Sequence, residues 1–381
     1  MAGGRQSWGS VRKLKSGRWQ ARYRVGAERI AATTTFRTKR DAEAYLSTVR
    51  ADMERGLWIS PTAGQITLHE YATTWLDQRP NLRPRTREGY ESQLRRHILP
   101  VLGATELAKI TPRQVRAWNA AMVKSTTTGR ITAAKCYRLL RTILSTAVID
   151  ELLVKNPCVI KGAGVEKAPE RPVATIDQVY EIADAIEPRF RALVLTATFT
   201  GLRLGELRAL TRERVDILHA RIKVVEQYQD LRNGTLLLCP PKSDAGVRTV
   251  AIPAILKPEL EIHLATFSAP GKKGLVFCGT LDQPLRVSTL HTAWKRAVNA
   301  VGIEGFRFHD LRHTGNTLAA STGASTKELM SRMGHASPRA ALIYQHATQD
   351  RDQEIAAAVS ALVEARRTTR PDNAGGPTAI R

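Results

Sequence analysis

The stretch TGLRLGEL, residues 200–207, decides how the C-terminal half of the chain folds. Gly201 is the residue type that most often ends a helix, and the leucines around it return at helical spacing. We therefore expect two helices with a glycine stop between them, and Arg203 at the start of the second. Glu206, one turn later, can hold the guanidinium of Arg203. Such a pair at a helix start is usually just exposed, so its role depends on the residues that accompany it.

Three more candidate residues follow along the chain. Lys242 lies in PPKSDAG, residues 240–246, which we expect to join two strands as a hairpin that can reach into a substrate. His309 and Arg312 are three residues apart in FHDLRHT, so they share one face of a helix. Taken alone each is ordinary, because a hairpin lysine is usually idle in solvent.

The last candidates follow a helix that Ser325 and Glu328 are expected to cap and Gly334 to end. His335 stands just past that end, and a further helix that starts at a Ser-Pro pair carries Tyr344. A single tyrosine near a helix more often packs than reacts. With fixed positive charges beside it, however, a tyrosine can attack a phosphodiester without a metal.

We expect no metal or other cofactor. His309 and His313 have the spacing of a metal-binding pair, but no HExxH pattern or third ligand accompanies them. The cysteines at 136, 158, 239 and 278 are too scattered for a CxxC site and are expected to be reduced core thiols. The N-terminus has no apolar signal segment, and no apolar stretch is long enough to span a membrane. We expect a cytoplasmic protein without a membrane partner.

The charge of the chain indicates a nucleic-acid partner. The 381 residues carry a net charge of +23 and have a pI of about 10.4, so the chain attracts polyanions. Residues 1–60 carry +8, residues 61–165 carry +9 and residues 166–381 carry +6. This concentration in the N-terminal half argues against a merely soluble basic protein or a membrane-surface protein. It indicates DNA-binding parts ahead of a more balanced catalytic part.

The first segment is expected to be a small sheet with one helix. From residue 18 to 25 apolar side chains take the odd positions, the period of a half-buried strand. A second extended run spans 31–36, and Thr38 with Asp41 resembles a capping box ahead of a helical stripe. The even positions give the strand a basic face, which we expect to contact DNA rather than only solvent. That face consists of Arg18, Gln20, Arg22 and Arg24.

Residues 66–157 are expected to be all helix. A capping box starts the first helix at Thr67, Thr86 begins the second, and Thr111-Pro112 begins the third. A fourth helix runs from about 132 to 152 and presents a charged face, which is usually only solvated. Beside a DNA-processing domain we expect its cations to contact phosphates: Lys135, Arg138 and Arg141. The rest of the chain is expected to be mostly helical with three short strands, near 221–226, 235–239 and 247–252.

The sequence resembles the tyrosine recombinase or phage integrase family. TGLRLGEL, PKSDAGVR, FHDLRHT and MGHASPRAALIYQH look like the family's arginine, lysine, histidine-x-x-arginine, second-histidine and tyrosine boxes, in order and at ordinary separations. The resemblance implies a multidomain, mainly α protein. Its expected parts are a β-sheet-plus-helix arm-type DNA-binding domain at 1–60, a helical core-binding domain at 65–160, an α+β catalytic domain at 173–365 and a disordered tail at 366–381.

The resemblance also implies a role for each candidate residue. Tyr344 would attack the scissile phosphate and form a 3′-phosphotyrosine, so no ATP is needed. Arg203 and Arg312 would bind the non-bridging oxygens, and Lys242 would protonate the 5′-oxygen leaving group. His309 would assist proton transfer from the tyrosine. Two further residues complete the set, His335 as a donor to a phosphate oxygen and Glu206 as a support.

The implied partners are double-stranded DNA attachment sites and other copies of the chain. The family works as a tetramer that exchanges strands through a Holliday junction, and an accessory bending or directionality factor is an open question. An Ala-rich helix at 352–363, with apolar Ile355, Ala358, Val359 and Leu362, has little reason to be buried in its own domain. We expect it to dock on a neighbouring protomer.

The leading hypothesis is therefore an integrase that recombines a phage or other mobile element with a bacterial chromosome, working at the nucleoid. A resolvase of chromosome or plasmid dimers, or a type IB topoisomerase, would use the same chemistry. The extra basic N-terminal segment favours the integrase over these. A non-catalytic DNA-binding regulator that kept the fold is the alternative from another class, and the intact boxes argue against it.

Overall fold

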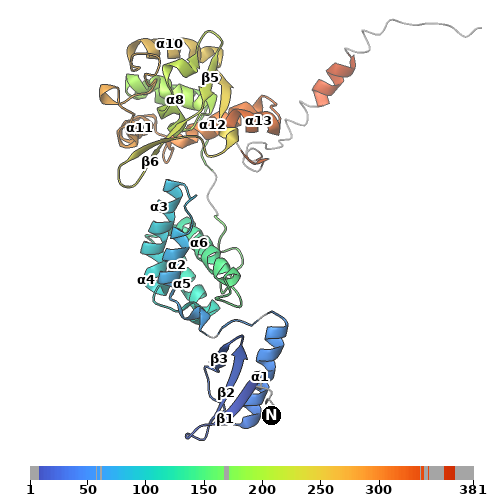
Figure 1. The fold of residues 1–381 in the computed structure, drawn as a ribbon. Helices are drawn as coiled ribbons and strands as arrows, with labels where there is room; N and C mark the ends of the chain where they lie inside the picture. Colours follow the sequence, from blue (N-terminus) through green and yellow to red (C-terminus); the bar gives the residue numbers. More distant parts are fainter. Residues whose placement is uncertain are drawn as a thin grey trace, which may run out of the picture. The chain divides into compact units, whose positions relative to one another are not determined.

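The computed structural model describes residues 8–56, 58–60, 62–166, 171–334, 336–338, 342 and 356–364 (Figure 1). The chain divides into two compact units, Met1–Pro169 and Glu170–Arg381. The first unit contains two separate hydrophobic cores, and the second contains one large core.

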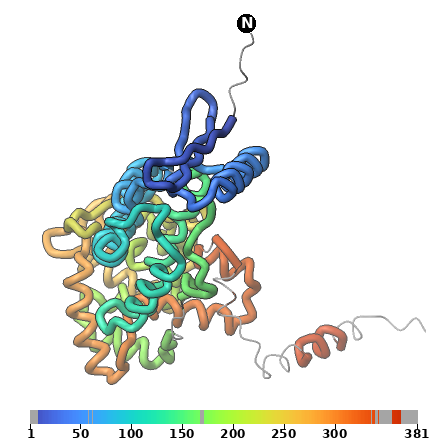
Figure 2. Tube along the Cα trace, turned by 90° about the horizontal axis from the view of Figure 1, so that it is seen from below, coloured from blue at the N-terminus to red at the C-terminus, as the bar shows by residue number. Residues whose placement is uncertain are grey.

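The N-terminal part of the first unit is a three-stranded antiparallel sheet covered by one helix (Figures 1 and 2). The strands are β1 (Gly9–Lys13), β2 (Trp19–Val25) and β3 (Glu28–Ala31), in that order across the sheet. Helix α1 (Lys39–Glu54) packs against β2, where Ala21 and Tyr23 are buried. The predicted strand at 18–25 is confirmed, whereas the predicted run at 31–36 is wrong. Gly26, with φ of 57°, turns the chain straight into β3. Of the predicted run, Ala31 pairs with Arg22 as the last residue of β3, and Phe36 forms an isolated bridge with Trp19.

The rest of the first unit is helical, as predicted. Its helices are α2 (Leu68–Asp77), α3 (Pro84–Gln93), a π-helical turn η2 (Leu94–Ile98), α4 (Leu99–Leu102), α5 (Pro112–Lys124) and α6 (Gly129–Ile149). Short 3₁₀ turns η1 (Ala63–Gln65) and η3 (Leu107–Lys109) complete it. The capping box at Thr67 is confirmed, and Thr111 forms another with Gln114. The predicted start at Thr86 is wrong by two residues, because Pro84 occupies the first helical turn.

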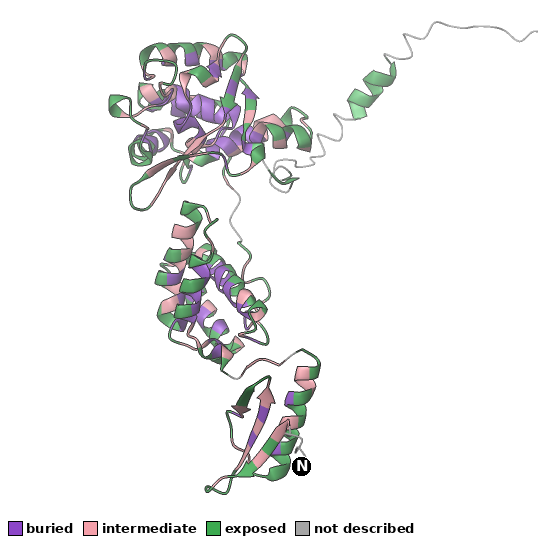
Figure 3. Ribbon diagram, in the orientation of Figure 1, coloured by how far each residue is buried: buried purple, intermediate pink, exposed green. Residues whose placement is uncertain are grey.

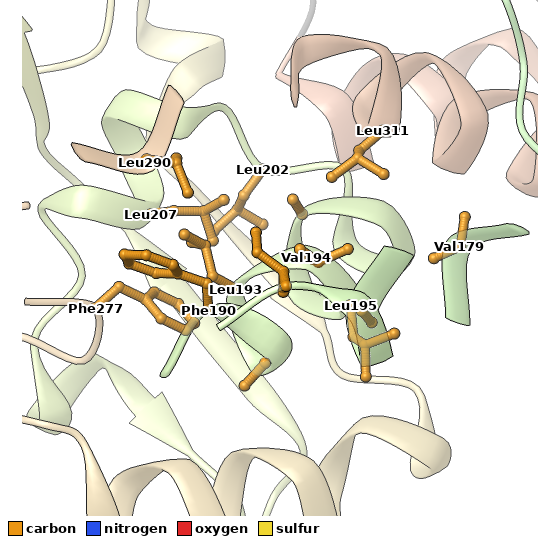
Figure 4. Packing of buried hydrophobic residues seen from close by; sticks show 14 of the residues in the cluster. Val179, Phe190, Leu193, Val194, Leu195, Leu202, Leu207, Phe277, Leu290 and Leu311 are labelled. Atoms are coloured by element: carbon orange, nitrogen blue, oxygen red, sulfur yellow. The ribbon is translucent and has the colours of Figure 1, made fainter. Parts of the chain in front are cut away.

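The second unit is built around the buried helix α8 (Pro188–Thr200) (Figures 3 and 4). Figure 4 shows Phe190, Leu193, Val194 and Leu195 of α8 among side chains from several other elements. The surrounding helices are α7 (Ile176–Ala185), α9 (Leu204–Arg208), α10 (Lys257–Thr266), α11 (Val287–Val301), α12 (Phe308–Ser321) and α13 (Thr326–Met333). Four 3₁₀ turns join them: η4 (Arg212–Arg214), η5 (Asp244–Gly246), η6 (Ala254–Leu256) and η7 (Thr280–Asp282).

Two small antiparallel sheets complete the second unit. One has the order β4 (Val215–Asp216), β5 (Arg221–Val224), β8 (Arg248–Ala251), and the other pairs β6 (Gln227–Asp230) with β7 (Leu236–Cys239). The three predicted strands correspond to β5, β7 and β8, but β4 and β6 were missed. As a result the predicted hairpin around Lys242 is wrong. Residues 240–247 join β7 to β8, which pair with different strands in different sheets.

The last described segment is a helical stretch at 356–364, whose residues are all exposed (Figure 3). The predicted disordered tail, 366–381, lies outside the described residues, as do Asp352 and Ile355 of the predicted tail helix. Among the helices that the structure describes, none combines the length and the apolar character that crossing a membrane requires.

Candidate active site

Arg203 is fixed by the turn between α8 and α9. Gly201 ends α8 in the left-handed conformation, with φ of 67°, as the sequence predicted. Arg203 is the N-cap of α9, and its backbone N–H and Nη1 donate to the two carboxylate oxygens of Glu206 at 2.9 and 2.8 Å. Its Nη2 donates to the carbonyl of Gly334 at 3.2 Å. The Arg203 side chain is 35% exposed, so it can still meet a ligand.

Arg312, on helix α12, also contacts the turn between α8 and α9. It is buried on α12, where Nη1 donates to the carbonyl of Gly201 and Nη2 to that of Met333, the latter at 2.6 Å. The Gly201 carbonyl is two residues from Arg203, and the Met333 carbonyl precedes the one that Arg203 contacts. The structure therefore brings Arg203 and Arg312 together. Their order in the sequence did not by itself require this proximity.

His309 lies at the start of α12, one turn before Arg312. Its ring stands edge-on to that of His313, with centroids 5.4 Å apart. Burial, followed by the neighbouring His313 and the charge of Arg312, lowers the pKa of His309 to about 4. At neutral pH the imidazole is thus uncharged. Among the described residues, no group of three or more histidines, cysteines or carboxylates could hold a metal ion.

Glu206 is the carboxylate at the centre of the site. Only 1% of its side chain is exposed, and burial raises its pKa. The hydrogen bonds and charge of Arg248, followed by those of Arg203, outweigh this effect, so the pKa lies below the usual range. A buried carboxylate held ionised by two guanidiniums is a rigid support for a positive site.

Sequence reasoning missed Arg248. Its Nη2 and Nη1 donate to the two oxygens of Glu206 at 2.9 and 3.2 Å, and only 5% of its side chain is exposed. A signal for it existed, because Arg248 stands two residues before the buried Val250 on β8 and so shares the inward face of that strand.

The other candidates are placed less fully. Lys242 is exposed in the loop 240–247, whose Gly246 carbonyl accepts from Arg248 Nη1 at 3.0 Å. His335 and Tyr344 lie outside the described residues. The helix before them is as predicted, since Ser325 and Glu328 form a capping box and Gly334 ends α13 with φ of 63°.

The predicted DNA-contacting side chains lie on the first unit. Gln20 Oε1 accepts from Arg22 Nε at 3.2 Å and from Arg12 Nε of β1 at 2.9 Å, and Arg24 stands opposite Arg29 of β3. Two arginines in directly opposed positions repel each other, which suits a face that meets a polyanion. Arg18 instead donates to the hydroxyl of Thr35 at 2.6 Å.

The cations on α6 are partly neutralised. Arg138 forms an ion pair with Glu166, and Lys135 lies 3.8 Å from the same carboxylate. Arg141 is exposed. All four cysteines are free, and Cys136 and Cys158 are buried, with pKa values that burial raises to about 11 and about 12.

Comparison with known protein families gives three matches along the chain. Residues 173–351 match the model of the phage integrase family, residues 7–55 that of the phage integrase N-terminal domain, and residues 67–122 that of the phage integrase N-terminal SAM-like domain. A Mycobacterium tuberculosis protein that carries the name of a prophage phiRv2 integrase is 42% identical over 370 residues, covering 94% of this chain and 97% of that one. An integrase of Mycobacterium phage D29 is 34% identical over 377 residues, covering 95% and 99%.

Solved structures show the same fold. The Tn1549 transposon integrase, residues 82–397 in complex with a circular intermediate DNA, superposes with a TM-score of 0.68 at 20% identity, covering 77% of this chain and 99% of that one. A lambda integrase tetramer bound to a Holliday junction superposes with a TM-score of 0.56 at 19% identity, covering 86% and 96%.

Proposed function

The chain belongs to the phage integrase family and is a site-specific tyrosine recombinase, and on this premise we propose which residues carry the reaction. Tyr344 attacks the scissile phosphate of a DNA attachment site and forms a 3′-phosphotyrosine, which frees a 5′-hydroxyl. The reverse attack by a 5′-hydroxyl on that linkage rejoins the strands. Because the bond energy is retained in the phosphotyrosine, the reaction needs no nucleotide cofactor.

Arg203 and Arg312 neutralise the charge that develops on the phosphate. The convergence of these two side chains on the Gly201 turn and the end of α13 is the observation that carries the proposal. Their forks are oriented before DNA binds, so little reorganisation is needed in the transition state. Glu206 accepts a hydrogen bond from Arg203 Nη1 and so orients its guanidinium.

The remaining proposed roles are proton transfers. His309, uncharged at neutral pH, assists removal of the proton from Tyr344. Lys242 is exposed on its loop, where an ammonium can reach the leaving 5′-oxygen and protonate it. His335 donates to a non-bridging oxygen.

Trapping of the covalent adduct tests this assignment. The full chain is incubated in EDTA with a nicked suicide duplex that carries the core site from the DNA flanking its gene, and a denaturing gel separates protein-linked DNA. We expect an adduct from the wild type and from Tyr228→Phe, a control on the half-buried strand β6, but none from Tyr344→Phe. An adduct of wild-type yield from Tyr344→Phe would place the nucleophile elsewhere.

We propose three DNA-related parts, with the boundaries 1–60, 65–160 and 173–365. The sheet face with Gln20, Arg22 and Arg24 supports an arm-site reader, and the helical part supports a core-site reader through Lys135, Arg138 and Arg141. Arg18 is retained in the first set, although its fork is engaged with Thr35. The pairing of Lys135 and Arg138 with Glu166 means that DNA must displace this carboxylate to reach them.

We propose that the working assembly is a homotetramer on two DNA sites, in a bacterial host at its nucleoid. An accessory bending or directionality factor would decide between integration and excision. The described helical stretch at 356–364 exposes Val359 and Leu362, an apolar surface that suits docking on a neighbouring protomer. Truncation after Ala347 tests this docking. We expect the truncated chain to bind one core site but to lose synapsis and strand exchange, and normal recombination by it would contradict the docking.

A further inference from the structure

Three successive carbonyls at the end of α13 accept hydrogen bonds from three arginines of different elements. The carbonyl of Arg332 accepts from Arg248 Nε at 2.9 Å, that of Met333 from Arg312 Nη2 at 2.6 Å and that of Gly334 from Arg203 Nη2 at 3.2 Å. The last carbonyls of a helix have no internal partners and carry its partial negative charge, so cations are favoured there. The end of α13 thus fixes the positions of all three guanidiniums.

Arg248 is buried among protein groups, whereas the side chain of Arg203 is 35% exposed. Besides the carbonyl of α13, its guanidinium contacts both oxygens of Glu206 and the carbonyl of Gly246. Glu206 in turn holds the backbone and Nη1 of Arg203. One side chain therefore connects the support of Arg203, the loop that carries Lys242 and the helix that ends just before His335.

We propose that Arg248 is a positioning residue for strand cleavage. It does not touch DNA, but it fixes the Glu206 carboxylate beneath Arg203 and holds the loop 240–247 against the end of α13. This inference rests on the proposed function, because it takes Arg203 and Lys242 as groups that act on the phosphate.

The planar fork of an arginine is needed for this role. Arg248 directs Nε, Nη1 and Nη2 at three different protein groups, whereas a lysine ammonium is a single point charge that cannot meet all of them at once. Gly334 leaves room for the fork, since a Cβ there would stand 3.0 Å from Arg248 Nη1.

Removal of Arg248 would also change the charge state of Glu206. The carboxylate faces Arg203 on its own element and Arg248 on β8, and the charge of Arg248 also acts on Arg332 of α13. Without Arg248, burial is opposed by Arg203 alone, so the pKa of Glu206 rises. Once protonated, Glu206 no longer pairs with the charge of Arg203, and cleavage slows as the pH falls through the raised pKa. In the wild type the pKa of Glu206 is lowered, so this loss of cleavage occurs only below the pH range in which the enzyme is assayed.

The test compares single-turnover cleavage of the suicide substrate by full-length variants between about pH 5.5 and 8.5, with core-site binding measured by fluorescence anisotropy. The variants are Arg248→Met, Arg248→Lys, Glu206→Gln and the double variant Arg248→Met with Glu206→Gln. Arg191→Met is the matched control, because Arg191 pairs with Glu259 and Asp184 in the same unit but away from the site.

We expect Arg248→Met to bind core DNA like the wild type but to cleave it about 100-fold more slowly at pH 7. Its rate should fall further toward low pH, where the wild-type rate is level, and this acid limb should vanish in the double variant. The double variant should cleave no more slowly than the slower single variant, because the two residues act as one unit. Arg248→Lys should keep the level pH profile and recover part of the rate.

Two results would overturn the proposal. One is cleavage by Arg248→Met at the wild-type rate and with the wild-type pH profile. The other is a loss of cleavage that only follows a loss of folded protein, in Arg248→Met and in the milder Arg248→Lys alike, with a level pH profile in Arg248→Met. If the wild type itself forms no adduct that depends on Tyr344, the proposed function fails instead, and Arg248 has no reaction to serve.

Discussion

His309 connects the proposed chemistry to the stability of the fold. Its pKa of about 4 in the folded chain lies below the ordinary value of 6.5 that it regains on unfolding. Between these values the unfolded state binds the proton and the folded state does not, so stability that is present above pH 6.5 is lost as the pH falls toward 4. We expect the free energy of unfolding to drop more steeply over this range in the wild type than in His309→Gln.

Urea unfolding at several pH values, followed by tryptophan fluorescence, measures this difference. His313, whose pKa is also lowered by burial, provides the comparison, because His313→Gln should remove a separate part of the same slope. Equal slopes for the wild type and His309→Gln would mean that His309 is not kept neutral by the fold.

Arg312 should not tolerate replacement by lysine. Its fork donates to two carbonyls, one at the end of α8 and one at the end of α13, and an ammonium would leave one of them buried without a donor. We expect Arg312→Lys to lower the free energy of unfolding by about 1–3 kcal/mol. Adduct formation should fall by about 100-fold or more. The control is Arg296→Lys, an exposed arginine of α11, which should behave as the wild type in both measurements.

Local signals predicted single residues well where the interaction is between near neighbours in sequence. The glycine stops at Gly201 and Gly334 and the capping boxes at Thr67 and Ser325 all occur, because each involves residues within one helical turn. The contacts of Arg248 with Glu206 and with the end of α13 span 42 and 84 residues, and no local pattern encodes such separations. Long-range hydrogen bonds depend on tertiary packing, so the sequence could not predict them.

At the level of elements, the crossing of α8 and α12 holds the two arginines together. A Cβ built on Gly315 would stand 1.8 Å from the carbonyl oxygen of Thr198, so alanine there must push the two helices apart. We expect Gly315→Ala to destabilise the chain by about 1–3 kcal/mol or more. Cleavage should fall with it, because the contact of Arg312 with Gly201 joins these same helices.

Gly89→Ala is the matched control for that prediction. Gly89 lies inside α3 with no atom within 4 Å of its would-be Cβ, so alanine should be neutral or stabilise by about 0.5–1 kcal/mol. Unfolding by urea and the adduct assay measure both variants. Equal behaviour of the two alanine variants would show that the helix crossing adapts freely.

An ion pair and a hydrogen bond also connect the start of the second unit to α12. Arg171 donates through Nε and Nη2 to the carboxylate of Asp310 at 2.8 and 2.5 Å, and the N–H of Ala174 donates to Thr314 at 3.1 Å. Asp310 is buried, and it also accepts the N–H of Arg307, which caps the helix that carries His309.

We expect Arg171→Met to destabilise the second unit by about 3 kcal/mol, because it leaves a buried carboxylate without its cation. Arg171→Met combined with Asp310→Asn should recover most of this loss. A double-mutant cycle from urea unfolding gives the coupling energy, and strictly additive losses would contradict a direct pair.

The loop that carries Lys242 shows where prediction of elements failed. Two extended runs flanking a Pro-Pro-Lys segment predict one hairpin, because sequence-neighbouring strands usually pair. In the structure β7 pairs with β6, and β8 pairs with β5. The pairing of β7 therefore depends on β6, a strand that the pattern of polar and apolar residues did not reveal. Strand β6 has four half-buried residues without a clear polar–apolar period, and for this reason it was missed.

At the scale of the whole molecule, the charge distribution was readable from composition, whereas the partners of individual cations were not. The excess of positive charge in residues 1–165 predicted DNA-binding parts there. The structure adds that Glu166 engages two of the cations of α6 and that the sheet face keeps several of its own close together. If that face binds arm-site DNA, its arginines should affect arm-site binding specifically, which net charge alone would not predict.

We expect Arg22→Ala with Arg24→Ala to weaken binding to arm-site DNA and to leave core-site binding unchanged. If each arginine neutralises one phosphate, the slope of log affinity against log salt should fall by about 1.8 in magnitude, since each phosphate contact contributes about 0.9.

The control is Arg37→Ala with Arg40→Ala, which removes the same net charge from two exposed arginines outside the strands. Fluorescence anisotropy titrations with labelled arm and core duplexes at several salt concentrations measure the slopes. If both double variants lose the same affinity for both duplexes, the sheet face contributes only net charge. A loss confined to the arm duplex and to the sheet variant identifies β2 as the element that lies against DNA.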